Sequence, residues 1–274
     1  MKVVLSIAGS DSSGGAGIQA DLKTMTAHGV FGMTAITALT AQNTTGVTGI
    51  VESSPEFMAA QIDACLTDIP ADAIKIGMLP SVELLEVVVD RLKRYEAKNI
   101  VTDPVMVSTS GSKLMQNSTS TKMAELLFPI STVITPNIPE TEVLLGSSVS
   151  NKKDMENAAE VLGKRYGCAV LVKGGHAIED ANDVLYVNGK VVWFQGRHID
   201  NPNTHGTGCT LSSAIASNLA LGYDLVKSVK NAKDYLSKAI GANLNLGHGS
   251  GPLNHMVSSE GAIIIADKRE WALR

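Results

Sequence analysis

Hydrophobic residues occur along this chain in two kinds of segment. Short, continuous apolar runs occupy residues 3–9, 73–78, 99–106, 132–135 and 169–173, as expected of strands that are buried on both faces. Longer segments with the spacing of an amphipathic helix lie between and after them, at residues 54–67, 81–95, 152–166 and 224–244. This alternation predicts an α/β fold, a single domain with a mostly parallel central sheet and helices on both faces.

Three further segments complete this prediction. Residues 33–43 read as a strand that ends in two polar residues and is followed by a turn at 44–47. Residues 183–194 contain Asn188-Gly189, a pair typical of a tight hairpin turn, and form the only hairpin that we expect. Residues 257–274 have no recognisable pattern, so we assign the domain to residues 1–256 and leave the role of the tail open.

The stretch NTHGTGCT, residues 203–210, leads into a helix of small apolar residues. Gly206 and Gly208 lack a Cβ, so the backbone can approach a ligand closely, and the helix start offers N–H groups that favour an anion. Thr207 adds a hydroxyl, and we expect a phosphate or oxyanion site here. The same N–H groups are expected to lower the pKa of Cys209 and make it a base or nucleophile. A tight turn with Cys209 as buried filler has the same spacing.

A second glycine-rich loop, residues 9–17, joins the first strand to a helix. The loop lacks the Lys and Ser/Thr of a P-loop, and its glycine spacing does not fit the dinucleotide-binding fingerprint. It is therefore either a tight turn or part of a ligand site. Asp11 and Asp21 favour a ligand site, because both lie near the carboxyl end of a strand, where open α/β sheets bind ligands.

Polar residues recur at the other strand ends. Gln42 offers an amide donor and acceptor to a heterocycle. Asp103, Asn137 and Glu140 together suit a Mg²⁺ ion beside phosphate oxygens, although each alone is more often a helix cap. Lys173 ends a strand before two glycines, which suggests a phosphate partner. Residues 107–114 are small and polar, and they are either a flap over the site or a surface loop.

Composition narrows the class of protein. With 44% apolar and 18% charged residues, the 274-residue chain can bury one large core. A formal charge of -4 and the lack of a basic run argue against nucleic acid as a partner. No apolar stretch approaches the roughly 20 residues that span a membrane. The chain has three cysteines, Cys65, Cys168 and Cys209, and no two of them have the spacing of a metal-binding pair. An odd number gives no disulfide framework, which is typical of a protein in the reducing cytoplasm.

Seven segments together resemble the hydroxymethylpyrimidine/phosphomethylpyrimidine kinases of thiamine biosynthesis, in the ribokinase superfamily. They are AGSDSSGGAGIQAD (8–21), TAQNT (40–44), KIGML (75–79), DPVMV (103–107), TPNIPE (135–140), VKGGH (172–176) and NTHGTGCT (203–210). The resemblance runs from residue 3 to about residue 255, and seven motifs in order make it specific. It implies a ribokinase-like kinase that uses ATP and Mg²⁺ to phosphorylate hydroxymethylpyrimidine, and then phosphorylates the monophosphate to the pyrophosphate.

The resemblance also implies roles for single residues, carried over motif by motif. The residues implied for the pyrimidine pocket are Gln42, Asp21, Gly9, Met78 and Val105. Those implied for ATP are Lys173, Asn137, Thr135 and Gly175, and those implied for the metal are Asp103 and Glu140. Those implied for the anion hole are Gly206, Thr207 and Gly208. The superfamily further suggests a homodimer.

Cys209 stands where many ribokinase relatives have an aspartate base. Phosphoryl transfer passes through a loose transition state, in which positioning and charge stabilisation matter more than a strong base. We therefore expect Cys209 to accept the hydroxyl proton but to supply the smaller part of the rate.

Other functions share some of these features. A pyridoxal kinase of the same subgroup would have the same anion loop and a ring that bears a hydroxymethyl group. Gln42 favours the pyrimidine, as does Ser108, where a pyridoxal-type relative with a thiol flap would have cysteine. A close analogue is often rejected only modestly, so activity on both rings stays open.

Two unrelated functions fit less well. A cysteine hydrolase built on Cys209 and His205 has no orienting acid that the sequence places beside them. A non-catalytic nucleotide-binding regulator could lose its acidic residues or its lysine, but Asp103, Glu140 and Lys173 are all present.

Overall fold

The computed structural model describes residues 1–106, 117–175, 181–196 and 198–258 of the chain. In this part of the chain one sheet has the strand order β3-β2-β1-β4-β5-β6-β7-β8-β9. Its strands are β1 (Val3–Asp11), β2 (Phe31–Asn43), β3 (Gly46–Glu52), β4 (Ala73–Ile76), β5 (Ile100–Thr102), β6 (Val133–Ile134), β7 (Ala169–Val172), β8 (Asp183–Val187) and β9 (Lys190–Phe194).

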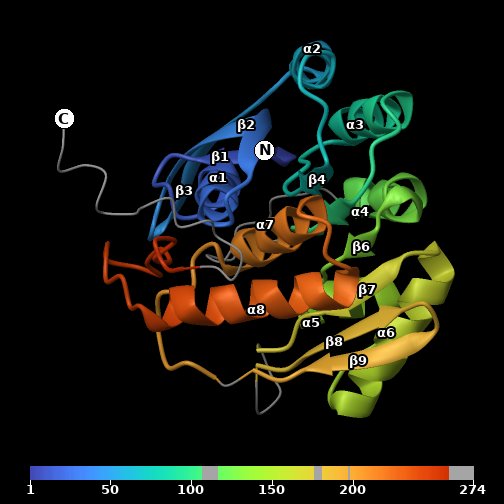
Figure 1. Cartoon of the computed structure of the whole chain (residues 1–274), viewed down its shortest axis with the longest axis vertical. Coiled ribbons are helices and arrows are strands. Elements are labelled where there is room, and N and C mark those ends of the chain that lie inside the picture. Colours follow the sequence, from blue (N-terminus) through green and yellow to red (C-terminus); the bar gives the residue numbers. More distant parts are fainter. Residues whose placement is uncertain (107–116, 176–180, 197, 259–274) are drawn as a thin grey trace.

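The middle of the sheet is parallel and both edges are antiparallel. Strands β2, β1, β4, β5, β6 and β7 pair in parallel, whereas β3 pairs with β2, β8 with β7 and β9 with β8 in antiparallel fashion. The prediction of a single hairpin is therefore wrong, because a turn after Asn43 returns the chain into β3. Figure 1 shows the two hairpins at opposite ends of the molecule.

Helices follow most of the strands, as the alternating pattern predicts. They are α1 (Gly17–Ala27), α2 (Pro55–Leu66), α3 (Val82–Arg94), α4 (Asn117–Leu126), the 3₁₀ helix η1 (Phe128–Ile130), α5 (Ile138–Leu145), α6 (Lys152–Tyr166), α7 (Thr207–Ala220) and α8 (Leu225–Gly241). None of the helices in the described part of the chain is long and apolar enough to cross a membrane.

The sheet separates two apolar clusters. One cluster joins the sheet to α2, α3, α4 and α6, and the other joins it to α1, α7 and α8. Along β5, Ile100 belongs to the first cluster and the next residue, Val101, to the second. Successive strand residues point to opposite faces, so a strand covered on both sides must be apolar throughout. This confirms the prediction of an α/β sheet with helices on both faces.

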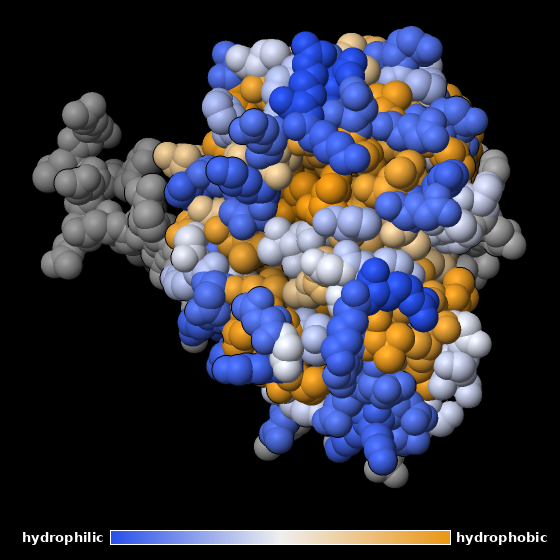
Figure 2. Space-filling view, turned by 90° about the vertical axis from the view of Figure 1, so that its right-hand side faces the viewer, coloured by the Kyte–Doolittle hydropathy of each residue, from blue (hydrophilic) through white to orange (hydrophobic). Residues whose placement is uncertain are grey.

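Local signals set the ends of several helices. The Ser54 side chain accepts a hydrogen bond from the Phe57 N–H at the start of α2, and Gly167 ends α6 in the left-handed conformation. Helix α3 buries its three leucines and two of its valines, and most of its charged residues are exposed. Figure 2, which faces the side of the molecule that carries α3, α4 and α6, shows hydrophilic groups with hydrophobic residues between them.

Candidate active site

The sheet and α7 together form a cavity of about 690 Å³ at the carboxyl ends of the parallel strands. This is where an open α/β sheet places its ligands. Most of the residues that the sequence singled out line it: Gly9, Gln42, Met78, Asp103, Val105, Asn137, Glu140, Lys173, Gly175, Gly206, Thr207, Gly208 and Cys209. Asp21 and Thr135 are the exceptions, and both lie behind the cavity wall. The predicted flap at 107–114 lies outside the described residues.

The start of α7 forms one wall of this cavity. Gly206 is the N-cap, in the left-handed conformation with φ of 86°. A Cβ at this position would lie 2.0 Å from the carbonyl oxygen of Gly15, so only glycine fits between the two glycine-rich loops. Residues 210–220 of α7 are all buried, which holds the helix start in place. Its first N–H groups thus form a rigid site for an anion.

Cys209 lies in the first turn of α7 and is partly accessible from the cavity. Burial raises the pKa of its thiol to about 11. The Lys75 ammonium opposes this rise in pKa, and the carboxylates of Asp21 and Asp103 add to it. The expectation of a lowered pKa is therefore wrong for the ligand-free protein. The helix N-terminus favours the thiolate, but the loss of water around the thiol outweighs it.

Asp103 and Lys173 form an ion pair in the wall of the cavity. The Lys173 ammonium donates to Asp103 Oδ1 at 2.8 Å, and the Thr135 hydroxyl donates to the same oxygen at 2.9 Å. A Cβ on Gly208 would lie 3.0 Å from Asp103 Oδ2, so the second carboxylate oxygen faces the start of α7. Thr135, which the resemblance implied for ATP, does not line the cavity. It is buried at 1% exposure and orients Asp103.

Glu140 lies beside this pair in the first turn of α5. Its Oε2 accepts from the Asn137 N–H at 2.9 Å, and the Asn137 side chain accepts from the Glu140 N–H at 2.9 Å, which together form a capping box. Burial raises the pKa of the Glu140 carboxyl to about 7, with Lys173 opposing the rise and Asp103 adding to it. Asn137 and Glu140 therefore are helix caps as well as lining the cavity.

Asp103 and Glu140 are suited to a magnesium ion. They provide two buried carboxylates side by side, and burial, with a smaller contribution from Asp103, raises the pKa of Glu140. Mg²⁺ is commonly bound by one or two carboxylates, with the remaining ligands from water and phosphate. No cluster of three or more His, Cys, Asp or Glu suitable for a metal occurs among the described residues. A site that depended on protein ligands alone would need more than these two.

Asp21 forms a buried ion pair with Lys75 instead of lining the cavity. Lys75 Nζ lies 2.9 Å from Asp21 Oδ2, and neither side chain has any exposure. The hydroxyls of Ser6 and Ser213 also donate to Asp21. Burial alone would lower the pKa of Lys75, but Asp21 raises it above its usual value. Asp21 is therefore a residue that fixes the charge of Lys75, which itself lines the cavity and was missed in the sequence.

Gly9, Met78 and Gln42 lie at one end of the cavity. A Cβ on Gly9 would lie 2.6 Å from Met78 Cε, so the methionine packs directly on the glycine backbone. Gln42, near the end of β2, faces the glycine-rich loop after β1. Its main-chain N–H donates to Ser12 Oγ at 2.9 Å, and the Ser12 hydroxyl donates to the Gln42 carbonyl at 2.8 Å.

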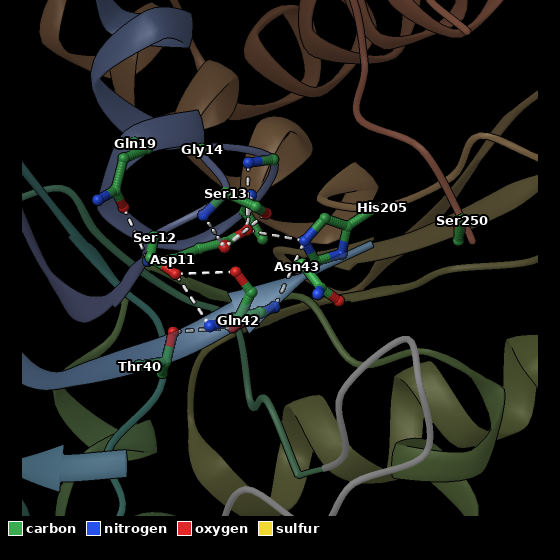
Figure 3. Close-up of polar contacts among 12 residues, drawn as sticks. Asp11, Ser12, Ser13, Gly14, Gln19, Thr40, Gln42, Asn43, His205 and Ser250 are labelled. Atoms are coloured by element: carbon green, nitrogen blue, oxygen red, sulfur yellow. Dashed lines mark hydrogen bonds and ion pairs between the residues drawn. The ribbon is translucent and has the colours of Figure 1, made fainter. Parts of the chain in front are cut away.

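Asp11 and His205 join the two glycine-rich loops (Figure 3). Asp11 Oδ2 lies 2.7 Å from His205 Nε2 and also accepts from the Ala16 N–H at 2.8 Å. Burial would raise the pKa of Asp11, but the hydrogen bonds from His205 and Ser13 hold it well below its usual range. Asp11 therefore organises the loop after β1, which supports the tight-turn interpretation of that loop as well as its place in the site.

The far end of the cavity is closed by Lys233 of α8. Its ammonium forms an ion pair with Asp183 and donates to the Ala181 carbonyl at 2.6 Å. Asp183 also accepts from the Gly174 N–H at 2.9 Å, which fixes the turn after Lys173. The sequence carried no signal for this pair, because Lys233 belongs to an amphipathic helix in which a lysine is usually exposed.

The sequence profile of the phosphomethylpyrimidine kinase family matches residues 11–254. The chain belongs to this family. The hydroxymethylpyrimidine/phosphomethylpyrimidine kinase of Haemophilus influenzae is 43% identical over 264 residues, which cover 94% of this chain and 98% of that protein. A thiamine biosynthesis bifunctional protein from Geobacter sulfurreducens is 45% identical over 258 residues, which cover 94% of this chain but only 53% of the relative.

Solved structures of related kinases share the fold. The crystal structure of a phosphomethylpyrimidine kinase from Clostridium difficile has a TM-score of 0.79 and 43% identity, and the match covers 88% of this chain and 100% of that one. A Staphylococcus aureus pyridoxal kinase in complex with AMP-PCP and pyridoxal has a TM-score of 0.86 and 31% identity, with 96% of each chain covered. These matches confirm the resemblance seen in the sequence and identify this member of the phosphomethylpyrimidine kinase family as a phosphotransferase with a ribokinase-like fold.

Proposed function

We propose that this kinase transfers the γ-phosphoryl group of ATP to the hydroxymethyl group of hydroxymethylpyrimidine, and a second phosphoryl group to the resulting monophosphate. The observation that carries the proposal is the arrangement around the start of α7. Gly206, Thr207 and Gly208 face Asp103 and Lys173 in one cavity. The family and the curated relatives, which are named for this reaction, support it.

The start of α7 serves as the anion hole in this proposal. The migrating phosphoryl group carries its charge on three oxygens, and catalysis consists mostly of holding them in place. The N–H groups at the start of α7 and the Thr207 hydroxyl are fixed before the substrate binds, so little reorganisation is needed. Burial alone would lower the pKa of Lys173, but the carboxylates of Asp103 and Glu140 raise it. The Lys173 ammonium therefore stays charged for the ATP phosphates.

Asp103 and Glu140 would hold Mg²⁺, directly or through water. When bound, the ion neutralises charge on the phosphate oxygens. In this proposal the second oxygen of Asp103 and the Glu140 carboxylate would be the protein groups that hold the ion, while Lys173 and Thr135 hold the first oxygen of Asp103. Asn137 and Gly175 line the cavity on the same side and contact the nucleotide.

The pyrimidine occupies the end of the cavity formed by Gly9, Gln42, Met78 and Val105. The Met78 side chain provides an apolar surface for the ring, and the Gln42 amide provides one donor and one acceptor for its polar edge. The hydroxymethyl group then points toward Cys209. In this proposal the thiolate form of Cys209 accepts the hydroxyl proton late in the transfer and becomes the thiol. Because burial raises the pKa of this thiol, the thiolate is the minor form at neutral pH, and it contributes less to the rate than the anion hole does.

Pyridoxal is the second candidate substrate. The similarity to the Staphylococcus aureus pyridoxal kinase favours it, because that structure has the same fold and holds AMP-PCP and pyridoxal together. The pyrimidine is favoured because the phosphomethylpyrimidine kinase structure has 43% identity with this chain, against 31% for the pyridoxal kinase.

A coupled ADP-release assay tests the proposal. The full chain is given Mg²⁺-ATP with hydroxymethylpyrimidine, its monophosphate or pyridoxal at equal concentrations, and blanks contain no acceptor. We expect turnover of the first two substrates and much slower turnover of pyridoxal. Faster turnover of pyridoxal than of either pyrimidine would show that pyridoxal is the preferred substrate. If none of the three acceptors increases ADP release above the blank, both candidate functions are contradicted.

We further propose a homodimer that works in the cytoplasm. Leu39 and Val51 are cross-strand neighbours on β2 and β3 and are 56% and 68% exposed. Strand β3 is also a sheet edge, and an apolar edge of this kind favours pairing with another chain. Light scattering on the purified protein is expected to give the mass of two chains, and Val51→Lys is expected to shift it to one. A monomeric wild-type mass would contradict the dimer.

A further inference from the structure

Asp183, the first residue of β8, holds two separate parts of the cavity wall, one with each carboxylate oxygen. Its Oδ1 accepts from the Gly174 N–H at 2.9 Å, in the turn that follows Lys173. Its Oδ2 accepts from the Lys233 ammonium of α8. Asp183 and Lys233 are both buried, so little water competes for these bonds. One carboxylate therefore ties the turn after β7 to α8.

Residues 181–183 pack closely against both of these parts. A Cβ on Gly174 would lie 2.0 Å from the Asn182 carbonyl oxygen, so the two main chains are in direct contact. The Lys233 ammonium donates to the Ala181 carbonyl oxygen at 2.6 Å as well as to the carboxylate. Lys233 is thus held by two oxygens of this segment, which fixes the segment against α8.

Lys173 depends on this tie for the course of its backbone. The Lys173 N–H donates to the Pro136 carbonyl oxygen at 2.8 Å, which fixes the residue on the side of β7. On the other side the chain continues into Gly174 and Gly175, and glycine restricts the backbone less than any other residue. The hydrogen bond to Asp183 holds the peptide group between Lys173 and Gly174. Without it, the turn after Lys173 is free to change direction.

Both of the joined parts line the cavity in which ATP is proposed to bind. The turn contributes Gly174 and Gly175, and α8 contributes Lys233 and Leu236. A ligand at this end of the cavity lies between them. The tie through Asp183 therefore acts on two walls of the proposed nucleotide site at once.

We propose that Asp183 and Lys233 are positioning residues for ATP. Asp183, anchored on α8 through Lys233, holds the Gly174 peptide and so keeps the Lys173 ammonium where the nucleotide phosphates bind. Lys233 uses its charge on Asp183 and on the Ala181 carbonyl oxygen, and not on the nucleotide. The inference rests on the proposed function, because it takes Lys173 to contact the ATP phosphates.

Position and charge can be separated in this pair. Lys233→Met removes one positive charge near the phosphates, whereas the double variant Lys233→Met/Asp183→Asn leaves the net charge unchanged. A buried ion pair can often be replaced by uncharged residues of similar size without loss of stability, so the double variant is expected to fold. Its new amide oxygen can still accept from Gly174, but the tie to α8 is gone.

The tie is tested first without any nucleotide. Lys173-Gly174 is the only Lys–Gly pair in the sequence. In the full chain labelled with carbonyl-¹³C lysine and ¹⁵N glycine, a carbonyl-edited amide spectrum therefore shows Gly174 alone. We expect this amide to exchange with solvent at least about tenfold faster in Lys233→Met than in the wild type, because its acceptor is no longer held. Equal exchange in both proteins would overturn the proposal.

The consequence for binding is measured by calorimetry with Mg²⁺-ADP and with adenosine. We expect the dissociation constant of ADP to rise about tenfold in Lys233→Met and in the double variant, because a contact to a charged phosphate is weakened. Adenosine has no phosphate, so its dissociation constant should stay within about twofold. In the ADP-release assay the KM for ATP should rise by a similar factor, and the KM for hydroxymethylpyrimidine should not change.

Lys230→Met is the matched control. Lys230 lies one turn before Lys233 on α8 and forms an exposed ion pair with Asp234 at 2.7 Å. This variant removes the same charge from the same helix but leaves the tie intact. Its dissociation constant for ADP is expected to stay within about twofold of the wild-type value, and a tenfold rise would show that any loss of positive charge weakens ADP.

The outcomes separate this inference from the proposed function. If the wild type binds ADP and both Lys233 variants bind it equally well, the pair only supports the fold and the inference is wrong. It is also wrong if the double variant binds ADP normally, because Lys233 then acts through its charge. A loss of adenosine binding as large as that of ADP would show that the pair acts on the nucleoside instead. If the wild type binds neither ADP nor ATP, the proposed function is wrong.

Discussion

Lys75 Nζ lies 2.9 Å from Asp21 Oδ2, and both side chains are completely buried between β4 and α1. Lys75 lines the cavity and Asp21 lies behind it, and the Lys75 ammonium lowers the pKa of Cys209. A buried charge without its partner is far less stable than one in water. The integrity of the site therefore depends on a carboxylate that does not itself reach the cavity.

Asp21→Asn is expected to lower the free energy of unfolding by about 3–5 kcal/mol, because it leaves Lys75 buried and uncompensated. Urea denaturation measures the change. Glu160→Gln breaks the exposed pair with Lys164 and is the matched control, with an expected loss below about 1 kcal/mol. Adding Lys75→Met to Asp21→Asn should recover part of the loss. Equal, small effects in both single variants would show that Lys75 sheds its charge easily.

Gly206→Ala is expected to lower kcat/KM by about 100-fold or more, because the new methyl group displaces the loop against Gly15 and moves the anion hole. Gly222→Ala provides the control. Gly222 has φ of 94°, close to the 86° of Gly206, but no atom lies within 4 Å of its added methyl group. It should lose about 1 kcal/mol of stability from backbone strain alone and keep its activity. Similar kinetics in both variants would contradict the packing argument.

The Cys209 thiol is expected to titrate near pH 11 in the ligand-free protein. The measurement is the difference in ultraviolet thiolate absorbance between the wild type and Cys209→Ala, which removes the contributions of Cys65 and Cys168. A step below the usual thiol pKa of about 8.5 would show that the helix N-terminus outweighs burial after all. Retention of full turnover in Cys209→Ala would contradict the proposed role of the thiol as base.

Glu140 is expected to make the protein less stable as the pH rises from 4.5 to about 7. In this window the unfolded chain has lost the carboxyl proton and the folded protein still holds it, so folding is favoured at the acidic end. The stabilisation is fully lost above pH 7 and amounts to about 3 kcal/mol. Urea denaturation of wild type and Glu140→Gln at both ends of the window measures it. The variant should lack this component, and parallel pH profiles would contradict the assignment.

Magnesium dependence should follow the same carboxyl group. A proton on Glu140 competes with the ion, so the Mg²⁺ concentration for half-maximal turnover is expected to fall as the pH rises through about 7. Glu140→Gln should need about tenfold more Mg²⁺ and lose this pH dependence, because the variant keeps only one of the two carboxylates proposed to hold the ion. Removal of Mg²⁺ by a chelator should abolish turnover. An unchanged Mg²⁺ requirement in the variant would place the ion elsewhere.

The alternation of apolar strands with amphipathic helices was enough to predict the α/β class, most of the helices and the place of the site. Strands such as β5 and β7 must be apolar on both faces, so each is seen in the sequence as a continuous apolar run. Gly206 and Gly208 are needed where the backbone comes close to a ligand or to another loop, so they too are visible as a motif. Strand β3 was missed because it lies exposed at the edge of the sheet, so that no alternation of buried apolar and exposed polar residues marks it.

The charges in the site depend on the fold and could not be predicted from local sequence. The pKa of Cys209 is raised because the folded protein removes water from around the thiol. The local sequence shows only the helix start, which has the opposite effect on this pKa. Asp21 and Lys75 are 54 residues apart, and Asp11 and His205 are 194 apart. Such partners meet only when strands and loops from distant parts of the chain pack together. The residues of the site are thus visible in the sequence, whereas their charges and orientations follow from burial and from partners that only the fold supplies.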